Sequence, residues 1–233
     1  MKKLSLLALF VSLLACQAVK EEQTTDVQEP ESKPAFRFAE DIAAFETEDQ
    51  AHPVPADVIV FTGSSSIRKW TTLSEDLAPA QVINRGFGGS TMPELIHYAD
   101  RIVWPYKPKA VFIYEGDNDI TSEAVTPDSM FRTFQEFHHL AKEHIPGTNL
   151  YFISIKPSVA RKNLFEKASQ TNALVKAYCE ANDDLTYVDV VSPMLKADGV
   201  VRSDIFVQDS LHMNATGYEL WTEVIRPLVA VEK

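Results

Sequence analysis

The chain has 233 residues, of which 45% are hydrophobic and 10% aromatic, which is enough for one globular domain with a sizeable core. Its 8 glycines and 13 prolines exclude a collagen-like or low-complexity protein. The formal net charge of −11 disfavours binding to nucleic acid, which depends on clustered Lys and Arg, but it leaves neutral and esterified substrates open.

The first 15 residues have the features of an export signal. Lys2 and Lys3 precede an almost unbroken apolar run over residues 4–15. A run of about 12 residues fits the core of a signal peptide and is well short of the ~20 residues that span a bilayer. It ends in Leu-Leu-Ala-Cys, which resembles a bacterial lipobox, where the cysteine, here Cys16, is lipidated and begins the mature protein. An ordinary cleaved signal with a chance cysteine is the alternative.

A polar, acidic segment with two prolines follows over residues 17–35. It contains almost nothing to bury, so we expect a disordered tether. The expected organisation is a signal peptide over residues 1–15, the lipidated Cys16 and its linker over residues 16–35, and one folded domain over residues 36–233. Lipidation of Cys16 predicts a protein of the cell envelope, held by its lipid on the periplasmic side of the outer membrane.

Apolar runs and amphipathic stretches alternate along the rest of the chain. The predicted strands are residues 57–61, 81–84, 110–114, 149–155 and 185–191. The predicted helices are residues 36–50, 93–103, 129–144, 164–180 and 214–229, and Thr91 is a candidate cap for the second. This alternation predicts an α/β domain with a parallel sheet covered on both faces. Ligands of such sheets bind at the carboxyl ends of the strands, so functional residues are expected there.

Two segments rich in small residues follow the first two predicted strands. Residues 61–68 run from a strand through Gly-Ser-Ser-Ser into a helix start, where backbone N–H groups and the helix dipole favour negative charge. A helix cap and turn is the alternative. Residues 84–91 contain three glycines, which let a backbone approach a ligand closely. A tight strand-to-helix connection is the alternative for this segment.

Two further segments carry acidic, amide and imidazole groups. Residues 114–120 place Gly-Asp-Asn-Asp after an apolar strand. This cluster can bind a divalent metal, form a turn, or donate an amide hydrogen bond to a developing oxyanion. Asp209 and His212 lie three residues apart before the last helix, a spacing that lets the carboxylate hold the imidazole. A capped helix start with a surface histidine is the alternative.

Together, the four segments place Ser, Gly, Asn and Asp-x-x-His in this order at successive strand ends. This conjunction resembles the four sequence blocks of the SGNH, or GDSL-type, hydrolase family over residues 57–229. The resemblance implies the flavodoxin-like fold of that family, a three-layer α/β/α sandwich around a five-stranded parallel sheet. The five strands predicted from the sequence pattern agree with it.

The resemblance also implies the roles of individual residues. Ser65 is the nucleophile, His212 is its base, and Asp209 supports the histidine. Ser64 stands where the family usually has Asp, and we expect it to act as a hydrogen-bonding group of the loop rather than as a catalyst.

An oxyanion hole is implied in the same way. Its donors are the Ser65 N–H, the Gly89 N–H and the side-chain amide of Asn118, with Gly88 as the alternative to Gly89. This chemistry needs no metal and no organic cofactor, so the metal interpretation of residues 114–120 becomes the weaker one.

The implied activity is that of a serine esterase. It would hydrolyse a small acyl ester, such as an acetyl group on a carbohydrate, through an acyl-enzyme. The alternatives are O-acyl transfer, lysophospholipid or thioester cleavage by the same triad, and a non-catalytic binding lipoprotein. The expected partners are an ester or acylated carbohydrate substrate and a membrane reached only through the lipid anchor, with no nucleic acid.

Some residues have no assigned chemistry. We expect Cys179 to be a small buried residue of a helix. Trp70 and Phe87 flank the expected site and either line a substrate pocket or pack in the core. The other histidines are expected on the surface or on helix faces: His52, His97, His138, His139 and His144.

Overall fold

The computed structural model describes residues 37–232. The predicted signal peptide over residues 1–15, Cys16, and the linker over residues 16–35 lie outside the described residues. Within residues 37–232, no helix is long and apolar enough to cross a membrane.

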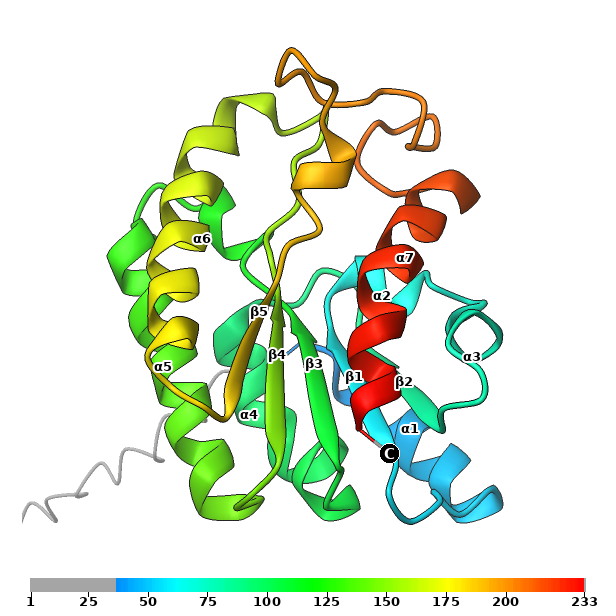
Figure 1. The fold of residues 1–233 in the computed structure, drawn as a ribbon. Helices are drawn as coiled ribbons and strands as arrows, with labels where there is room; N and C mark the ends of the chain where they lie inside the picture. Colours follow the sequence, from blue (N-terminus) through cyan, green and yellow to red (C-terminus); the bar gives the residue numbers. More distant parts are fainter. Residues whose placement is uncertain (1–36, 233) are drawn as a thin grey trace, which may run out of the picture. The chain divides into compact units, whose positions relative to one another are not determined.

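Five parallel strands form one sheet in the order β2-β1-β3-β4-β5 (Figure 1). The strands are β1 (Ile59–Gly63), β2 (Val82–Gly86), β3 (Ala110–Tyr114), β4 (Asn149–Ile153) and β5 (Leu185–Val188). In the central part of the sheet Gly63 lies beside Gly86 on one side and Tyr114 on the other. Strands β1, β2 and β3 therefore end level with one another, and the loops that follow them start side by side.

The three central strands β1, β3 and β4 are mostly apolar because both faces of the sheet are covered. Alternate residues point to opposite faces. Val60, Val111 and Phe152 belong to the core on one face. Phe61 and Phe112 belong to the other, where their rings stack with centroids 4.5 Å apart.

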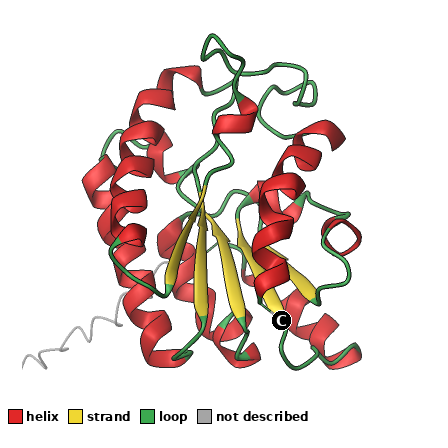
Figure 2. Ribbon diagram, viewed as in Figure 1, coloured by secondary structure: helices red, strands yellow, loops and turns green. Residues whose placement is uncertain are grey.

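Helices cover the sheet in two layers (Figure 2). One core contains residues of α1 (Ala39–Ala51), α4 (Met92–Ile102), α5 (Pro127–His144) and α6 (Phe165–Glu180). The other contains residues of α2 (Ser65–Arg68), α3 (Leu73–Asp76) and α7 (Ala215–Val231). Four short 3-10 helices occur in the connections: η1 (Trp104–Tyr106), η2 (Asp119–Thr121), η3 (Lys162–Leu164) and η4 (Ser192–Met194). The predicted three-layer α/β/α fold is thus confirmed.

The predicted elements differ from the observed ones mainly at their ends. Strand β3 has the predicted bounds, but β1 starts at Ile59 because Asp57 has a left-handed backbone with φ of 61°. Strand β5 ends at Val188, where the Asp189 carboxylate accepts hydrogen bonds from the N–H groups of Val191 and Ser192 and turns the chain. Helices α2 and α3 have four residues each, too few for a periodic apolar pattern.

Three residues without assigned chemistry lie in the core. Trp70 is 1% exposed and packs against Trp221, and Phe87 is fully buried against Tyr98. Core packing, rather than pocket lining, is therefore the correct interpretation of Trp70 and Phe87. Cys179 is buried as expected, and burial raises the pKa of its thiol to about 12.

Gly63 fixes the approach of β1 to β3, and Gly63→Ala tests that contact. A Cβ there would lie 2.1 Å from the Tyr114 carbonyl oxygen, at a φ of +128°, so we expect a loss of about 3 kcal/mol or more in unfolding free energy. In the control Gly147→Ala, φ is +85° but no heavy atom lies within 4 Å of the Cβ. Backbone strain alone should cost about 1 kcal/mol there. Urea unfolding of both variants measures the difference, and equal losses would contradict the steric argument.

Candidate active site

The four segments singled out in the sequence meet at the carboxyl edge of the sheet. Ser65 begins α2 directly after β1, Gly89 follows β2, and Asn118 follows β3. His212 comes from the long connection between β5 and α7. These four residues line one cavity of about 650 Å³. Its other lining residues are Arg68, Lys69, Thr71, Gly88, Arg161 and Leu211.

A continuous chain of hydrogen bonds joins serine, histidine and aspartate. The Ser65 Oγ lies 3.0 Å from His212 Nε2, although the two residues are 147 positions apart in the sequence. The His212 Nδ1 lies 2.6 Å from Asp209 Oδ2. With Nδ1 donating to the carboxylate, Nε2 is the nitrogen that can accept the serine proton.

The Asp209–His212 loop is held by its own backbone. Ser210 has a left-handed φ of 58°, which folds the chain back on itself. The Asp209 Oδ1 accepts hydrogen bonds from the N–H groups of Leu211 and His212, both at 2.9 Å. The hydrogen bond from the His212 imidazole, followed by those from the two backbone N–H groups, holds the pKa of Asp209 well below its usual range. Asp209 is therefore ionised at neutral pH.

The turn before Ser65 leaves backbone N–H groups at the cavity. Ser64 is buried, its N–H donates to the Tyr114 carbonyl, and its own carbonyl accepts from the N–H of Ile67. Its expected role in the loop is thus performed by its backbone. The N–H of Ser65 is the first of helix α2 and has no partner within the helix.

The two glycines after β2 differ in their surroundings. A Cβ on Gly88 would lie 3.7 Å from the Ser65 Cβ, so this backbone runs beside the serine. Gly89 has a left-handed φ of +93°, and a Cβ there would meet no heavy atom within 4 Å. Gly89 also lines a second cavity of about 500 Å³ on its other side, together with Asn118. The backbone at Gly89 is thus open to solvent from both cavities.

Asn118 has a fixed orientation. Its Nδ2 donates to the Ser90 carbonyl at 2.8 Å, and its Oδ1 accepts from Arg161 Nη2 at 3.0 Å. Because a guanidinium only donates, the amide oxygen must face Arg161 and the amide nitrogen must face the Gly89–Ser90 side. Sequence reasoning missed Arg161, since a single arginine in the connection after β4 has no motif around it.

A buried network of charges connects three of the loops. Arg161 Nη1 lies 2.7 Å from Asp117 Oδ1, and Lys156 Nζ lies 3.5 Å from Asp117 Oδ2. Lys156 also donates to the Leu211 carbonyl at 3.0 Å, next to His212. Burial raises the pKa of Asp117, but the charges of Lys156 and Arg161 outweigh burial and keep that pKa below its ordinary value. The network thus ties the Asn118 loop to the His212 loop.

Two more carboxyl groups lie beneath the glycine loop. Glu115 is fully buried, and its Oε1 accepts a hydrogen bond from Ser90 Oγ. Burial raises the pKa of Glu115 well above its ordinary value. Asp119 accepts hydrogen bonds from the N–H groups of Met92 and Gly116. Burial nevertheless raises the pKa of Asp119 to about 6.

The carboxylates of Asp117 and Asp119, which a metal ion at residues 114–120 would need as ligands, already bind other groups of the protein. Asp117 is paired with two cations, and Asp119 is occupied by backbone N–H groups. In the part of the chain that the structure describes, no group of three or more His, Cys, Asp or Glu side chains is arranged to hold a metal ion.

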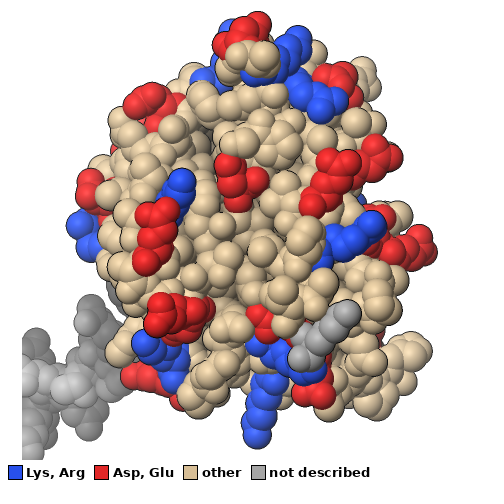
Figure 3. All heavy atoms as spheres, viewed as in Figure 1, with Lys and Arg blue, Asp and Glu red and all other residues tan. Residues whose placement is uncertain are grey.

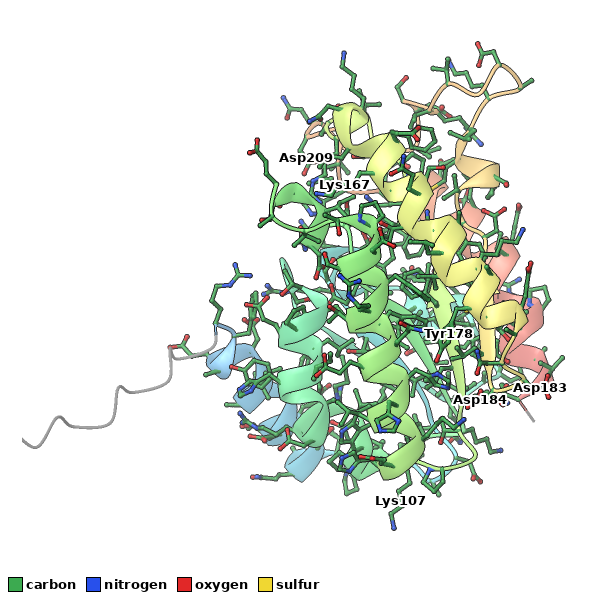
Figure 4. The ribbon with its side chains drawn as sticks, turned by 90° about the vertical axis from the view of Figure 1, so that its left-hand side faces the viewer. Lys107, Lys167, Tyr178, Asp183, Asp184 and Asp209 are labelled. Atoms are coloured by element: carbon green, nitrogen blue, oxygen red, sulfur yellow. The ribbon has the colours of Figure 1, made fainter. Side chains whose placement is uncertain are left out.

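One of the other histidines lies on a buried face of a helix. His138, on α5, is 2% exposed. Its Nδ1 lies 2.9 Å from the hydroxyl of Tyr178, and its Nε2 lies 3.0 Å from Asp184 Oδ2. Figure 4 shows Tyr178 and Asp184 far below Asp209, toward the opposite end of the domain. This cluster joins α5 to α6 and stands apart from the cavity at Ser65.

Comparison with known proteins identifies the family. The family model of GDSL-like lipases and acylhydrolases matches residues 49–220. The chain belongs to this family. As a GDSL-like acylhydrolase it is an enzyme that hydrolyses carboxylic esters. No curated protein matches it in sequence.

Solved structures with the same fold are similar to this GDSL-like acylhydrolase over most of its length. A protein from Bacteroides fragilis assigned as an acylhydrolase has a TM-score of 0.69 at 22% identity, covering 84% of this chain and 96% of its own. A GDSL-like lipase from Bacteroides thetaiotaomicron has a TM-score of 0.69 at 20% identity, covering 82% and 98%. An acetylxylan esterase from Geobacillus stearothermophilus has a TM-score of 0.62 at 15% identity, covering 74% and 94%. At these identities the likeness concerns the fold.

The raised pKa of Asp119 predicts a pH-dependent stability. The pKa of Asp119 is about 6 in the folded protein and 3.8 for the free group. As the pH falls, the folded state therefore binds this proton before the unfolded state does, which stabilises the folded state. From pH 7 to pH 5 the wild type should gain about 1 kcal/mol of unfolding free energy relative to Asp119→Asn. Urea unfolding at both pH values measures the gain. A wild type that loses stability relative to the variant would contradict the raised pKa.

Proposed function

We propose that this GDSL-like acylhydrolase is a serine esterase acting through a triad of Ser65, His212 and Asp209. The observation that carries the proposal is the hydrogen-bond chain from Ser65 Oγ through both nitrogens of His212 to the Asp209 carboxylate. Such a chain activates a hydroxyl that is otherwise a weak nucleophile. Solved structures of the acetylxylan esterase include catalytic mutants at a serine and at an aspartate, which supports the same assignment.

The proposed reaction has two halves. His212 Nε2 takes the hydroxyl proton as Ser65 Oγ attacks the ester carbonyl carbon. The tetrahedral intermediate then breaks its bond to the alcohol, which receives the proton from His212. Water next gives a proton to His212 and attacks the acyl-enzyme, and the acid leaves as Ser65 regains its proton. Asp209 stabilises the imidazolium in both halves.

The proposed oxyanion hole consists of the N–H groups of Ser65 and Gly89 and the Nδ2 of Asn118. All three residues line the cavity, and the Asn118 amide nitrogen faces the Gly89–Ser90 loop. Donors that are fixed before the reaction stabilise the oxyanion without a cost of reorganisation. Arg161 supplies this fixation for Asn118 from the opposite side of the amide.

The cavity favours a small acyl group. Among its described lining residues, only Leu211 has a large aliphatic side chain, so a long acyl chain would find little apolar surface to bury against. This argues against lysophospholipids and favours acetyl esters. Most of the lining residues have polar or charged side chains that can form hydrogen bonds with a carbohydrate alcohol, and the acetylxylan esterase with the same fold gives this choice further support. Acyl transfer to an acceptor alcohol would use the same residues.

We further propose that the enzyme works at the cell envelope on a lipid anchor at Cys16. The proposal rests on the lipobox-like Leu-Leu-Ala-Cys after the apolar run over residues 4–15. A tether over residues 17–35 would hold the esterase near polymers of the envelope.

Ser65→Ala tests the nucleophile. We expect the variant to lose more than about 10⁴-fold in kcat for 4-nitrophenyl acetate, because alanine has no hydroxyl to form the proposed acyl-enzyme. Release of 4-nitrophenol by the soluble domain measures it, with Ser210→Ala, in the same loop as His212, as the control. An acyl-enzyme trapped as a mass increase on Ser65 would give independent support. Unchanged turnover in Ser65→Ala would overturn the proposal.

Asn118→Ala tests the oxyanion hole. We expect kcat to fall about 10²–10³-fold with a smaller change in KM, since the amide acts mainly in the transition state. Asn149→Ala is the control and should retain wild-type kcat. Asn149 begins β4, so it lies at the amino ends of the strands, away from the carboxyl ends where the site lies. A loss confined to KM would assign Asn118 to substrate binding instead.

Cys16→Ser tests the anchor. In cells expressing the full chain, we expect radiolabelled palmitate to enter the wild type and not the variant, because only a thiol is lipidated at a lipobox. Membrane fractionation should show the wild type in the membrane pellet. Equal labelling of both proteins, or no labelling of either, would contradict a lipid anchor at Cys16.

A further inference from the structure

The cavity at Ser65 carries positive charge on a protein that is acidic as a whole. Three of its lining residues are cationic, Arg68, Lys69 and Arg161, and none of its described lining residues is Asp or Glu. The full chain has 33 acidic and 22 basic residues. Over the face shown in Figure 3, acidic and basic side chains are both widely spread. The cavity therefore has a charge opposite to that of the chain.

Arg68 reaches the nucleophile from the α2 side. A Cβ built on Gly88 would lie 3.2 Å from the Arg68 Nη1 and 3.7 Å from the Ser65 Cβ. The guanidinium and the serine thus lie within 4 Å of one point beside Gly88. Arg68 Nη2 lies 3.5 Å from Asp41, but the Arg68 side chain is 55% exposed, so this ion pair is weak and leaves the guanidinium available to a ligand.

Arg161 reaches the site from the other side, next to Asn118. Its partner Asp117 is shared with the buried Lys156, so this network of two cations and one carboxylate has a net positive charge. Lys69 adds a third cation, and no carboxylate of residues 37–232 lies within 4.0 Å of its ammonium group. An anion in the cavity would meet cations from two connections that are far apart in the chain.

We infer that the enzyme acts on esters whose alcohol carries an anionic group, either a carboxylate or a phosphate. The inference rests on the proposed function. A small acyl group such as acetyl carries no charge, so the anionic group of the ester must belong to the alcohol. Guanidinium groups bind both anions through paired hydrogen bonds, and an ammonium adds a point charge. A positive cavity also increases the association rate of anionic substrates, and salt reduces that effect.

A binding experiment tests the inference without turnover. The Ser65→Ala domain is titrated, with NMR detection, with three O-acetylated ligands: methyl glucoside, methyl glucuronoside and methyl glucoside 6-phosphate. They share a ring and differ in the group at C6. We expect one or both anionic ligands to bind about tenfold more tightly than the neutral one at low salt, and this preference to shrink at 0.5 M NaCl. The two anionic arms distinguish a carboxylate from a phosphate.

Substitution of the two exposed cations locates the effect. In Arg68→Gln/Lys69→Gln on the Ser65→Ala background, the ratio of anionic to neutral affinity should fall to below about threefold. Lys107→Gln is the matched control, because Figure 4 shows Lys107 at the end of the domain opposite Asp209. It should leave the ratio unchanged.

Two outcomes would overturn the inference. Equal affinities for the three ligands would do so, as would an anion preference that survives in the double variant. Turnover of 4-nitrophenyl acetate by the wild type is followed separately. Ser65-dependent turnover with no anion preference would leave the serine esterase standing and remove only the anionic substrate. Anion binding without turnover would support the anionic ligand and remove the esterase.

Discussion

Two backbone hydrogen bonds beyond the ends of the strands determine where the chemistry can occur. The Ser64 N–H donates to the Tyr114 carbonyl at 3.0 Å, and the Phe87 N–H donates to the Gly63 carbonyl at 2.8 Å. They continue the register of β1 with β3 and β2 past the last strand residue. The serine turn, the glycine loop and the Asn118 loop therefore start at one level. Gly63 is required because any Cβ would meet the Tyr114 carbonyl.

Charge, rather than packing, connects the remaining parts of the site. Isolated buried ions are costly, and Asp117, Lys156 and Arg161 are tolerated because each one has both an opposite charge and a hydrogen bond. Among the residues that the structure describes, Glu115 has no cation beside it, and its burial raises the pKa of its carboxyl group well above the ordinary value. The result is a rigid frame in which the Asn118 amide can point in only one direction. Rigid donors are what stabilisation of an oxyanion requires.

The cavity in front of Ser65 differs from this buried network, since it is open to solvent and lined by three cationic residues. Arg68 is the last residue of α2, the helix that Ser65 begins, and Lys69 follows it, whereas Arg161 comes from the connection after β4. The same arginine thus orients the Asn118 amide and contributes charge to the cavity. Catalytic geometry and the proposed substrate preference are linked through this residue.

The amino-acid pattern was sufficient to predict the layers of the fold and those parts of the site that lie close together in the chain. Apolar, β-branched runs predicted all five strands, because strands covered on both faces are rich in apolar residues. The Asp209–His212 spacing was visible because it is a local contact, closed by hydrogen bonds within one loop. The order of the four blocks was sufficient for the family.

The contacts between residues far apart in the chain became known from the folded structure. Nothing near Arg161 or Lys156 in the sequence indicates that they contact Asn118 and Leu211, which lie 43 and 55 positions away. Trp70 and Phe87 looked equally suited to a pocket or a core until the packing of α7 and α4 buried them. The positive charge of the cavity was hidden in a chain of net charge −11. Composition counts charges, whereas the fold decides which of them face one another.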